Sequence, residues 1–357
     1  MKILLVTSVF KPEAVGPARF ARLLIGSLNL SVYVLTSGAE ESEKVKNVGL
    51  QFKWWQRKLK IYFSISQLHK KLLEIESNYD FIIFNNSIFA HKYKGELPYL
   101  VMVNDEKLIS LKPFLRFDFL RRSLHRRIEK SSVEAAPKII VNSEYIKGKL
   151  LSAYNVDSSS VHTLLKGISL KDKKEHYVHR ELIRSIEVKV LFVKNDYLIG
   201  GLIELVKALE SLNEYKFDLT IAGSESKELN RLIYSDNIKV TVKGMIPNDQ
   251  VIDLMYKQDI LSIPSRFEPL GVAIMEGLAV GIPVVTTNQG GLPEVTNNGE
   301  FVWECEPNNS NSIANKILEC IENPELRKSK SEEGRRFVRS KFNFETVEKR
   351  LLELVKR

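Results

Sequence analysis

The hydrophobic pattern of this chain alternates between short apolar runs and longer helical patterns, and the whole alternation occurs twice. In the first half, several short runs have the β-branched and aromatic content of buried strands. They occupy residues 3–9, 32–36, 81–84, 100–103 and 139–142. Helical patterns lie between them, at residues 18–28, 67–75, 119–135 and 143–154. This order of strands and helices is typical of a doubly wound parallel sheet.

The alternation restarts after a charged, irregular stretch at residues 170–184, which has the composition of a linker. Strands are predicted at residues 188–193, 219–222, 238–242, 260–264, 283–286 and 301–303. Helices are predicted between them, at residues 201–212, 227–234, 248–257 and 272–280. Residues 344–357 predict an amphipathic helix that packs back across the other domain. Since 357 residues exceed what one hydrophobic core usually fills, we expect an α/β protein of two tandem Rossmann-like domains with a cleft between them.

Cysteine content and hydropathy exclude several classes of protein. Cys305 and Cys320 are the only cysteines, too few and too close for a secreted disulfide framework, which indicates a reducing compartment. The N-terminal apolar run ends at Lys11 without a cleavage pattern, so a buried strand fits better than a signal peptide. The most hydrophobic long segment, residues 270–291, holds Glu276 and is interrupted by glycine and proline, which argues against a membrane span. We therefore expect a cytoplasmic protein.

The positive charge of the chain lies in its first half. Residues 1–170 contain 26 lysines and arginines against 15 aspartates and glutamates, whereas the remainder contains 27 against 29. Such an asymmetry indicates that the first domain meets an anionic partner or surface. Two groups of basic residues are candidates for this contact. They are Lys53, Arg57, Lys58 and Lys60 beside Trp54 and Trp55, and Arg121, Arg122, Arg126 and Arg127 along one helix.

Cations next to tryptophan are typical of an interfacial membrane anchor, where each contributes about 1 kcal/mol near an anionic leaflet. The same composition also fits solvated charges beside core aromatics, and both interpretations stay open. Basic and aromatic patches also bind single-stranded nucleic acid, but no recognised nucleic-acid-binding motif supports such a partner. The membrane interpretation predicts a protein peripheral to the inner face of the cell membrane.

The segment most informative about chemistry is a turn followed by a helix, at residues 264–279. After a strand that ends near Pro264, the Glu-Pro-Leu-Gly turn at residues 268–271 opens a helix. The N–H groups of the first helical turn have no partners within the helix. Together with the helix dipole, those amides form an anion site suited to a diphosphate.

Two carboxylates belong to the same segment. Glu276 is the one charge on a helix that is apolar on nearly every side, and a buried carboxylate without a partner is costly. A vicinal diol such as that of ribose supplies two donors to it. Glu268 lies in the turn, eight residues earlier, so the two carboxylates can bracket one nucleotide sugar. The spacing is equally compatible with a Glu276 paired to an internal lysine or arginine and a solvated Glu268.

Residues 263–296, with this Glu-x7-Glu arrangement followed by Gly-Ile-Pro-Val-Val and Gly-Gly-Leu-Pro-Glu, resemble the donor site of the family 4 (group 1) retaining glycosyltransferases. Further similar segments lie at residues 12–20, 141–145, 259–260 and 323–326. The resemblance covers nearly the whole chain. It implies the GT-B fold, a nucleotide-diphosphate sugar as donor substrate, and no cofactor or active-site metal. The absence of an Asp-x-Asp metal motif agrees with this.

The resemblance also implies roles for individual residues. Glu276 would bind the ribose hydroxyls, and Glu268 would hold the transferred sugar or stabilise positive charge at its anomeric carbon. Gly16, in the loop after the first strand, would let the backbone approach the donor phosphates. The phosphates would also meet the start of the helix, at Leu270, Gly271 and Val272.

The chain departs from the family at two places. Where the family has an arginine and a lysine for the donor phosphates, this chain has Asn195 and Gly200, with Lys194 as the neighbouring cation. Where the family has a His-Asp pair, this chain has Asn104 and Asp105. An asparagine can hydrogen-bond a sugar hydroxyl but cannot accept a proton as histidine does. We therefore assign Lys194 and Asn195 to the donor and Asn104 and Asp105 to the reacting centre.

The combined prediction is an enzyme that transfers a sugar to a glycan or lipid-linked acceptor with retention of anomeric configuration, in the synthesis of cell-surface polysaccharide or lipopolysaccharide. Residues 1–170 would bind the acceptor, residues 171–340 the donor, and residues 341–357 would form the returning helix. Two alternatives stay open. One is a non-catalytic partner protein that binds sugar nucleotides, and the other is a nucleotide-sugar epimerase.

Overall fold

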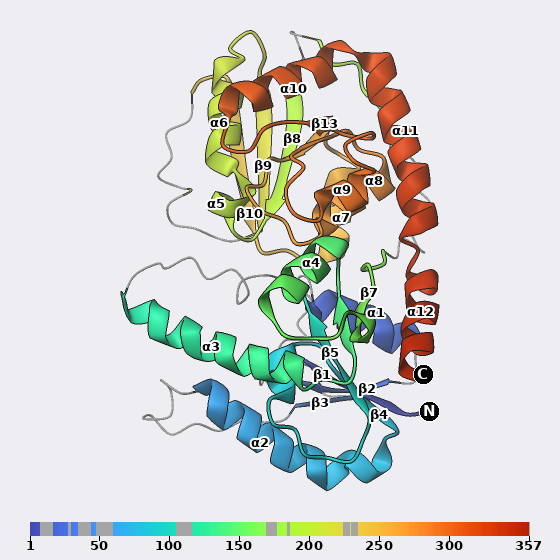
Figure 1. The fold of residues 1–357 in the computed structure, drawn as a ribbon. Coiled ribbons are helices and arrows are strands. Elements are labelled where there is room, and N and C mark those ends of the chain that lie inside the picture. Colours follow the sequence, from blue (N-terminus) through green and yellow to red (C-terminus); the bar gives the residue numbers. More distant parts are fainter. Residues whose placement is uncertain are drawn as a thin grey trace. The chain divides into compact units, whose positions relative to one another are not determined.

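The structure, a computed structural model, describes residues 1–7, 17–27, 30–34, 44–47, 60–104, 116–168, 177–183, 186–223, 229 and 235–356. The chain divides into two compact units (Figure 1). The first consists of Met1–Gly167 and Glu345–Arg357, and the second of Ile168–Phe344. Each unit is built on its own sheet, and every recorded pairing of strands in both sheets is parallel.

The sheet of the first unit has the strand order β3-β2-β1-β4-β5-β6-β7. Its strands are β1 (Ile3–Thr7), β2 (Leu30–Val34), β3 (Val45–Asn47), β4 (Phe81–Phe84), β5 (Tyr99–Val103), β6 (Ile139–Val141) and β7 (Val161–Thr163). The central strands are buried on both faces, as their continuous apolar sequences require. The chain order reverses at β1, so β1 and β4 meet at the switch point where doubly wound sheets bind ligands.

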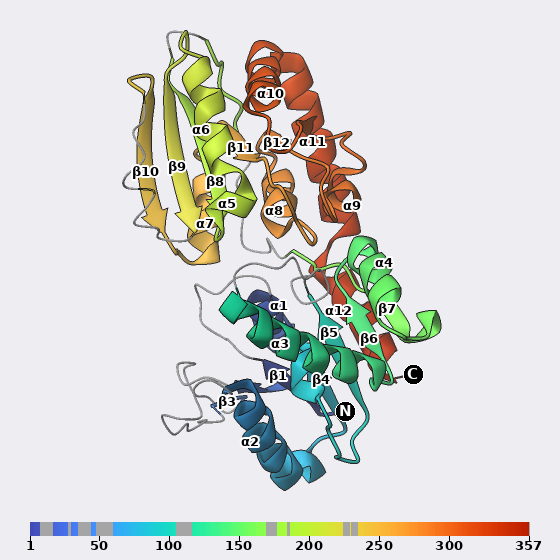
Figure 2. The ribbon, with the colours of Figure 1, turned by 60° about the vertical axis from the view of Figure 1, so that its left-hand side comes forward.

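Helices cover both faces of this sheet (Figure 2). They are α1 (Pro17–Ser27), α2 (Lys60–Ile75), α3 (Arg116–Glu134), α4 (Glu144–Ala153) and α12 (Phe344–Lys356). Apolar side chains of α2, α3 and α4 share one core with alternate residues of the strands. The last helix, α12, belongs to this first unit although it ends the chain, and Lys138 Nζ donates to the carbonyl of Leu354 at 2.9 Å.

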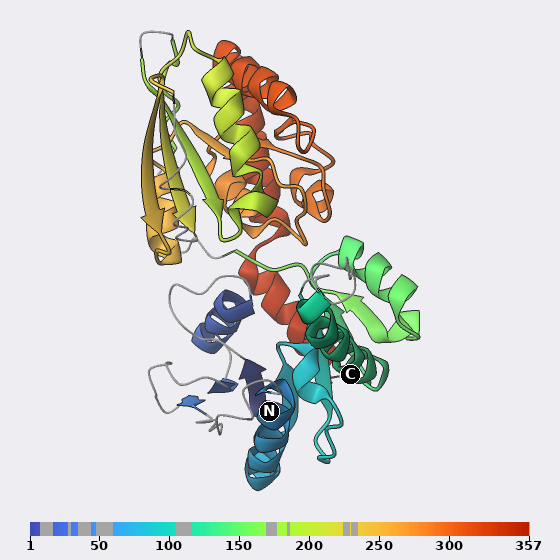
Figure 3. The same ribbon diagram turned by 90° about the vertical axis from the view of Figure 1, so that its left-hand side faces the viewer.

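The sheet of the second unit has the order β10-β9-β8-β11-β12-β13. Its strands are β8 (Val188–Lys194), β9 (Phe217–Gly223), β10 (Ile238–Gly244), β11 (Ile260–Ile263), β12 (Val284–Thr286) and β13 (Trp303–Glu304). Its helices are α5 (Tyr197–Gly200), α6 (Leu202–Ser211), α7 (Asn248–Met255), α8 (Val272–Val280), α9 (Leu292–Thr296), α10 (Ser310–Glu322) and α11 (Pro324–Lys341). Helices α6 and α10 pack together on one face, and α11 packs along α8 on the other (Figure 3).

The predicted fold class is confirmed, since two Rossmann-like parallel sheets with flanking helices make the GT-B fold. The structure adds elements that the hydrophobic pattern did not predict, namely β3, β7, α5, α9, α10 and α11. Helix α11 is strongly charged, and it buries only a narrow stripe that includes Arg327 and Val338, so its sequence lacks a broad apolar face. The helix predicted at residues 227–234 lies outside the described residues except for Leu229.

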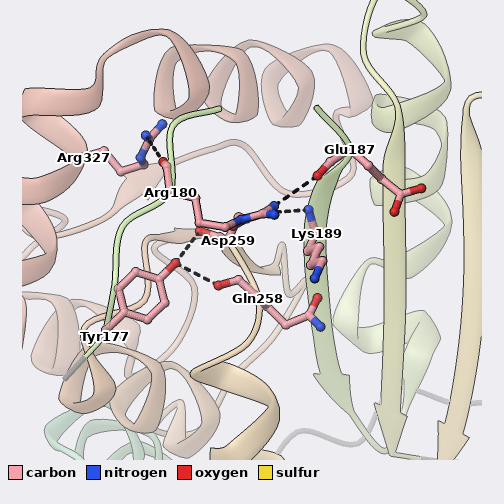
Figure 4. A network of polar contacts seen from close by, with 7 residues as sticks. All are labelled: Tyr177, Arg180, Glu187, Lys189, Gln258, Asp259 and Arg327. Atoms are coloured by element: carbon pink, nitrogen blue, oxygen red, sulfur yellow. Dashed lines mark hydrogen bonds and ion pairs between the residues drawn. The ribbon is translucent and has the colours of Figure 1, made fainter. Parts of the chain in front are cut away.

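The stretch predicted to be a linker is fixed to the second unit over residues 177–183 (Figure 4). Arg180 donates through Nε to Asp259 Oδ1 at 2.7 Å, and its guanidinium forms an ion pair with the same carboxylate. Asp259 also accepts the backbone N–H of Lys189 at 2.8 Å. The hydroxyl of Tyr177 donates to the carbonyl of Gln258 at 2.8 Å. Asp259 precedes β11, so this network lies at the amino edge of the sheet.

Candidate functional site

The turn before α8 leaves the first amides of that helix without a side-chain cap. Gly271 is the N-cap residue, in the left-handed region with φ 91° and ψ 48°, and it has no side chain that could accept an N–H. Leu270 is buried, whereas Val272 and Ala273 are half-buried. Because serine, threonine, aspartate or asparagine would normally satisfy these amides, a glycine here leaves them to another acceptor.

A second loop, between β12 and α9, holds this turn in place through close backbone contacts. A Cβ on Gly290 would lie 2.0 Å from the carbonyl oxygen of Glu268, and one on Gly291 would lie 2.3 Å from that of Pro269. The N–H of Gly291 donates to the Glu268 carbonyl at 2.9 Å. These two glycines therefore allow the loop to fix the backbone of Glu268 at the start of α8.

Glu276 is the one charged residue of α8 and is 2% exposed. Both of its carboxylate oxygens accept from the side-chain amide of Asn248, at 3.3 and 3.2 Å. Glu276 lies one helical turn after Val272, on the same face of α8. Since helical side chains lean toward the N-terminus, its side chain leans toward the first turn of the helix.

Asn248 was missed by the sequence analysis. It is the first residue of α7, directly after Pro247, and this position looks like an ordinary helix start. The contact with Glu276 arises because α7 packs against α8. No short-range signal in the sequence indicates this contact, since 28 residues separate the two side chains.

Lys194 lies at the carboxyl end of β8, and its Nζ forms an ion pair with Glu268 Oε2. The two side chains are 18% and 16% exposed. The carboxyl ends of neighbouring β8 and β11 thus bring the predicted cation and the predicted carboxylate together with the N-terminus of α8. Asn195, the next residue, is exposed and makes no recorded side-chain contact among the residues that the structure describes.

In the first unit, three asparagines follow three neighbouring strands, and we call Asn85, Asn104 and Asn142 the amide row. Asn85 donates to the hydroxyl of Thr7 at 3.2 Å. Asn104 donates to the carbonyl of Asn85 at 2.9 Å, and Asn142 to that of Asn104 at 2.8 Å. Each amide therefore bonds one strand back along the sheet, from β6 to β1, and fixes the carboxyl edge.

A small pocket lies beside the amide row. Asn104, Asn142 and Lys166 are its polar lining residues, and Lys166 is 8% exposed. The other lining residues, among them Phe20 and Met102, are apolar. The pocket has room for about one water-sized group, so it suits a single hydroxyl group and not a whole sugar ring.

Several predicted residues cannot be placed. Gly16, Asp105, Lys53, Trp54, Trp55, Arg57 and Lys58 lie outside the described residues. The side chains of Lys60, Arg121 and Arg122 are likewise outside them, although their backbones belong to α2 and α3. Of the second basic group, Arg126 is half-buried and Arg127 is exposed on α3.

Other chemistry finds little support in the described part of the chain. Both cysteines are buried, and burial raises the pKa of the Cys305 thiol to about 12, so it is not a thiolate near neutral pH. No group of three or more His, Cys, Asp or Glu residues that could hold a metal ion occurs among the described residues. Within the same ranges, no helix is both long and apolar enough to span a bilayer.

Residues 173–337 match the model of a protein family described as glycosyl transferases group 1. This region contains the α8 turn, Glu268, Glu276 and Lys194. These findings support a glycosyltransferase. An uncharacterized glycosyltransferase of Methanocaldococcus jannaschii is 25% identical, over 97% of this chain and 95% of its own length.

Solved structures of other proteins share the fold over nearly the full length of the chain. The sucrose-phosphate synthase of Thermosynechococcus elongatus has a TM-score of 0.79 at 18% identity, covering 99% of this chain and 98% of its own. A protein of Anabaena, solved with UDP and glucose, has a TM-score of 0.76 at 17% identity, covering 100% and 99%. At these identities the likeness establishes the fold alone.

Proposed function

We propose that this protein is a retaining glycosyltransferase that takes a sugar from a nucleotide-diphosphate donor bound by the second unit. The observation that supports this most is the uncapped first turn of α8 with a buried carboxylate one turn further on. The amides of that turn and the helix dipole attract the diphosphate. Glu276 would accept hydrogen bonds from the two ribose hydroxyls, and Asn248 would orient it.

Glu268 would act on the sugar that is transferred. As the bond between the anomeric carbon and the phosphate oxygen breaks, positive charge develops on that carbon and negative charge on the departing diphosphate. The fixed carboxylate of Glu268 would stabilise the positive charge on the anomeric carbon. The helix amides and Lys194 would stabilise the negative charge on the diphosphate, so the leaving group needs no metal or other cofactor. Asn195 is exposed near Lys194 and would contact the donor from the same edge.

The first unit would bind the acceptor, a glycan or a lipid-linked sugar. Asn104 and Asn142 have amide groups that can bond hydroxyl groups, beside a small pocket that Lys166 also lines. Asn104 would orient the reacting hydroxyl group. We assign Asp105, the next residue in the sequence, to the same reacting centre. We place the product in cell-surface polysaccharide or lipopolysaccharide. An uncharacterized 41.2 kDa protein in the cps region of Klebsiella pneumoniae is 25% identical over 62% of this chain, which supports this proposal.

The proposal is tested by thermal-shift screening of UDP-, GDP- and ADP-sugars, followed by transfer assays on hydroxylated acceptors with the donor that stabilises most. Binding to the native state raises the apparent stability by mass action. The expected product is a new glycoside whose anomeric proton has the same configuration as the donor's. An inverted product would contradict retention, an altered sugar without any acceptor would indicate an epimerase, and binding without turnover would indicate a non-catalytic protein.

We further propose that basic residues of the first unit bind anionic lipids at the inner face of the cell membrane. The exposed side chains of Arg127 and Lys130 on α3 support this, together with the positive charge of residues 1–170. Sedimentation with phosphatidylglycerol vesicles tests it. Binding at low salt that falls at high salt is expected, because the Debye length shortens from about 30 Å at 0.01 M to about 3 Å at 1 M. No binding at low salt would refute it.

A further inference from the structure

We propose that Lys194 and Glu268 form a latch in which the diphosphate of the donor draws Lys194 away from Glu268, so that Glu268 is freed only when a donor is present. This inference rests on the proposed function. It adds to that function a coupling between Lys194, which would bind the departing diphosphate, and Glu268, which would act on the sugar. In the structure, Lys194 and Glu268 form an ion pair.

The ion pair neutralises Glu268. Lys194 Nζ contacts Oε2 of Glu268, and both side chains are more than four-fifths buried. A carboxylate in contact with an ammonium group offers little net negative charge to a developing cation. Glu268 can therefore stabilise positive charge at the anomeric carbon only after Lys194 has left it and has bound another anion.

Gly200 fixes the direction of the Lys194 side chain. A Cβ on Gly200 would lie 2.9 Å from Lys194 Cγ and 2.5 Å from Phe192 Cζ, and the Phe192 ring is fully buried. The contact is with the stem of the lysine rather than with its flexible end. Any side chain at position 200 would therefore displace Lys194, and the glycine is a positioning residue for the latch.

The anion site adjoins Glu268. A Cβ on Gly271, the N-cap residue of α8, would lie 3.5 Å from Glu268 Cγ. A diphosphate on the amides of this turn therefore arrives next to the carboxylate that holds Lys194. A phosphate oxygen and the Glu268 carboxylate then compete for one ammonium group. The diphosphate has the larger charge and the amides hold it in place, so Lys194 moves to it.

The latch predicts that removing the charge of Glu268 tightens the binding of a nucleoside diphosphate that has no sugar. In Glu268→Gln, Lys194 no longer has to leave a carboxylate, so we expect affinity for the best of UDP, GDP and ADP to rise about three- to tenfold. Lys194→Met should weaken the same diphosphate about tenfold or more. In the Lys194→Met background, Glu268→Gln should change nothing. Isothermal titration of the wild type, the two single variants and the double variant gives the double-mutant cycle between Lys194 and Glu268 directly.

Gly200→Ala tests the positioning role. It should weaken the diphosphate in the wild-type background, and it should have no effect on diphosphate affinity when Lys194 is already methionine. A loss of equal size in both backgrounds would show a merely structural effect. If Gly200→Ala fails to fold, the cycle between Lys194 and Glu268 still decides the proposal.

Matched variants control for charge. Lys189→Met removes a lysine from the amino end of the same strand, and Glu204→Gln removes the carboxylate of the ion pair with Arg266. Neither should alter diphosphate affinity. If the wild type binds no nucleoside diphosphate, the proposed function fails. If it binds one but Glu268→Gln leaves its affinity unchanged or weakens it, the latch fails and the proposed function stands.

Discussion

The two sheets have the same order over their first six strands but carry different side chains at their carboxyl edges. The edge of the first sheet ends in amides. Asn142 and Asn104 donate to the backbone of the preceding amide residue, and Asn85 donates to the hydroxyl of Thr7. The edge of the second sheet ends in Lys194 and Glu268 beside the uncapped start of α8. An edge of amides suits neutral hydroxyl groups, and an edge of charges with free helix amides suits a diphosphate.

The difference shows how one architecture can serve two substrates. Parallel strands place whatever residue follows them at one edge, so three strand-end positions are enough to define a site. Hydrogen bonds between neutral groups contribute about 1 kcal/mol each, whereas those to charged groups contribute about 1.5–3 kcal/mol. Substitutions at the second edge should therefore have larger effects than substitutions at the first.

The largest effect is expected for Glu268→Ala on turnover. Losing a carboxylate that stabilises transition-state charge should lower kcat about 10²- to 10³-fold. Glu276→Ala should instead weaken donor binding more than Glu268→Ala does. Steady-state kinetics with titration of the intact nucleotide sugar separate the two roles, and two variants that behave as wild type would refute the assignment of this edge to the donor.

At the first edge, Asn142→Ala should raise KM for the acceptor about tenfold through the loss of one or two hydrogen bonds. Donor affinity should not change, since Asn142 belongs to the other sheet. Measuring KM for both substrates in the same assay checks this. An equal loss for donor and acceptor would remove the distinction between the edges.

A smaller effect is expected for Asn248→Ala. Its amide donates to both oxygens of Glu276 and helps to orient the carboxylate, so without it donor affinity should fall about fivefold. Titration of the donor against this variant and against Asn195→Ala compares a buried residue with an exposed one. A greater loss of donor affinity for Asn195→Ala would show that exposed Asn195 contributes more to donor binding than Asn248 does.

The smallest effect concerns pH and the stability of the first unit. Burial lowers the pKa of His69, whose Nε2 lies 2.7 Å from the Phe89 carbonyl oxygen. Because the unfolded state binds the proton more readily, stability is complete above pH 6.5 and falls as the pH drops toward the folded pKa. Thermal unfolding at pH 7.5 and 5.5 should show a smaller pH dependence for His69→Gln. An unchanged dependence would exclude His69 as its source.

Much of the fold was predictable because buried parallel strands give continuous apolar runs, and the central strands of both sheets were found in this way. Helix α11 was not, because its buried stripe is narrow and includes the charged Arg327, which bonds carbonyls of α10. Glu268, Glu276 and Gly271 could be singled out because they lie within one short segment. Asn248 and the Lys194–Glu268 pair could not, because packing between distant segments creates these contacts.

The central claim is that Glu276 binds the ribose of a nucleotide diphosphate held at the start of α8. The most direct test is isothermal titration of wild type and Glu276→Gln with a nucleoside diphosphate and with its 2′,3′-dideoxy analogue. We expect the wild type to prefer the ribose form by about 10- to 100-fold, since two hydrogen bonds to a carboxylate are lost, and the variant to lose most of this preference. If the wild type bound both forms equally, or the variant kept the full preference, the account would be wrong.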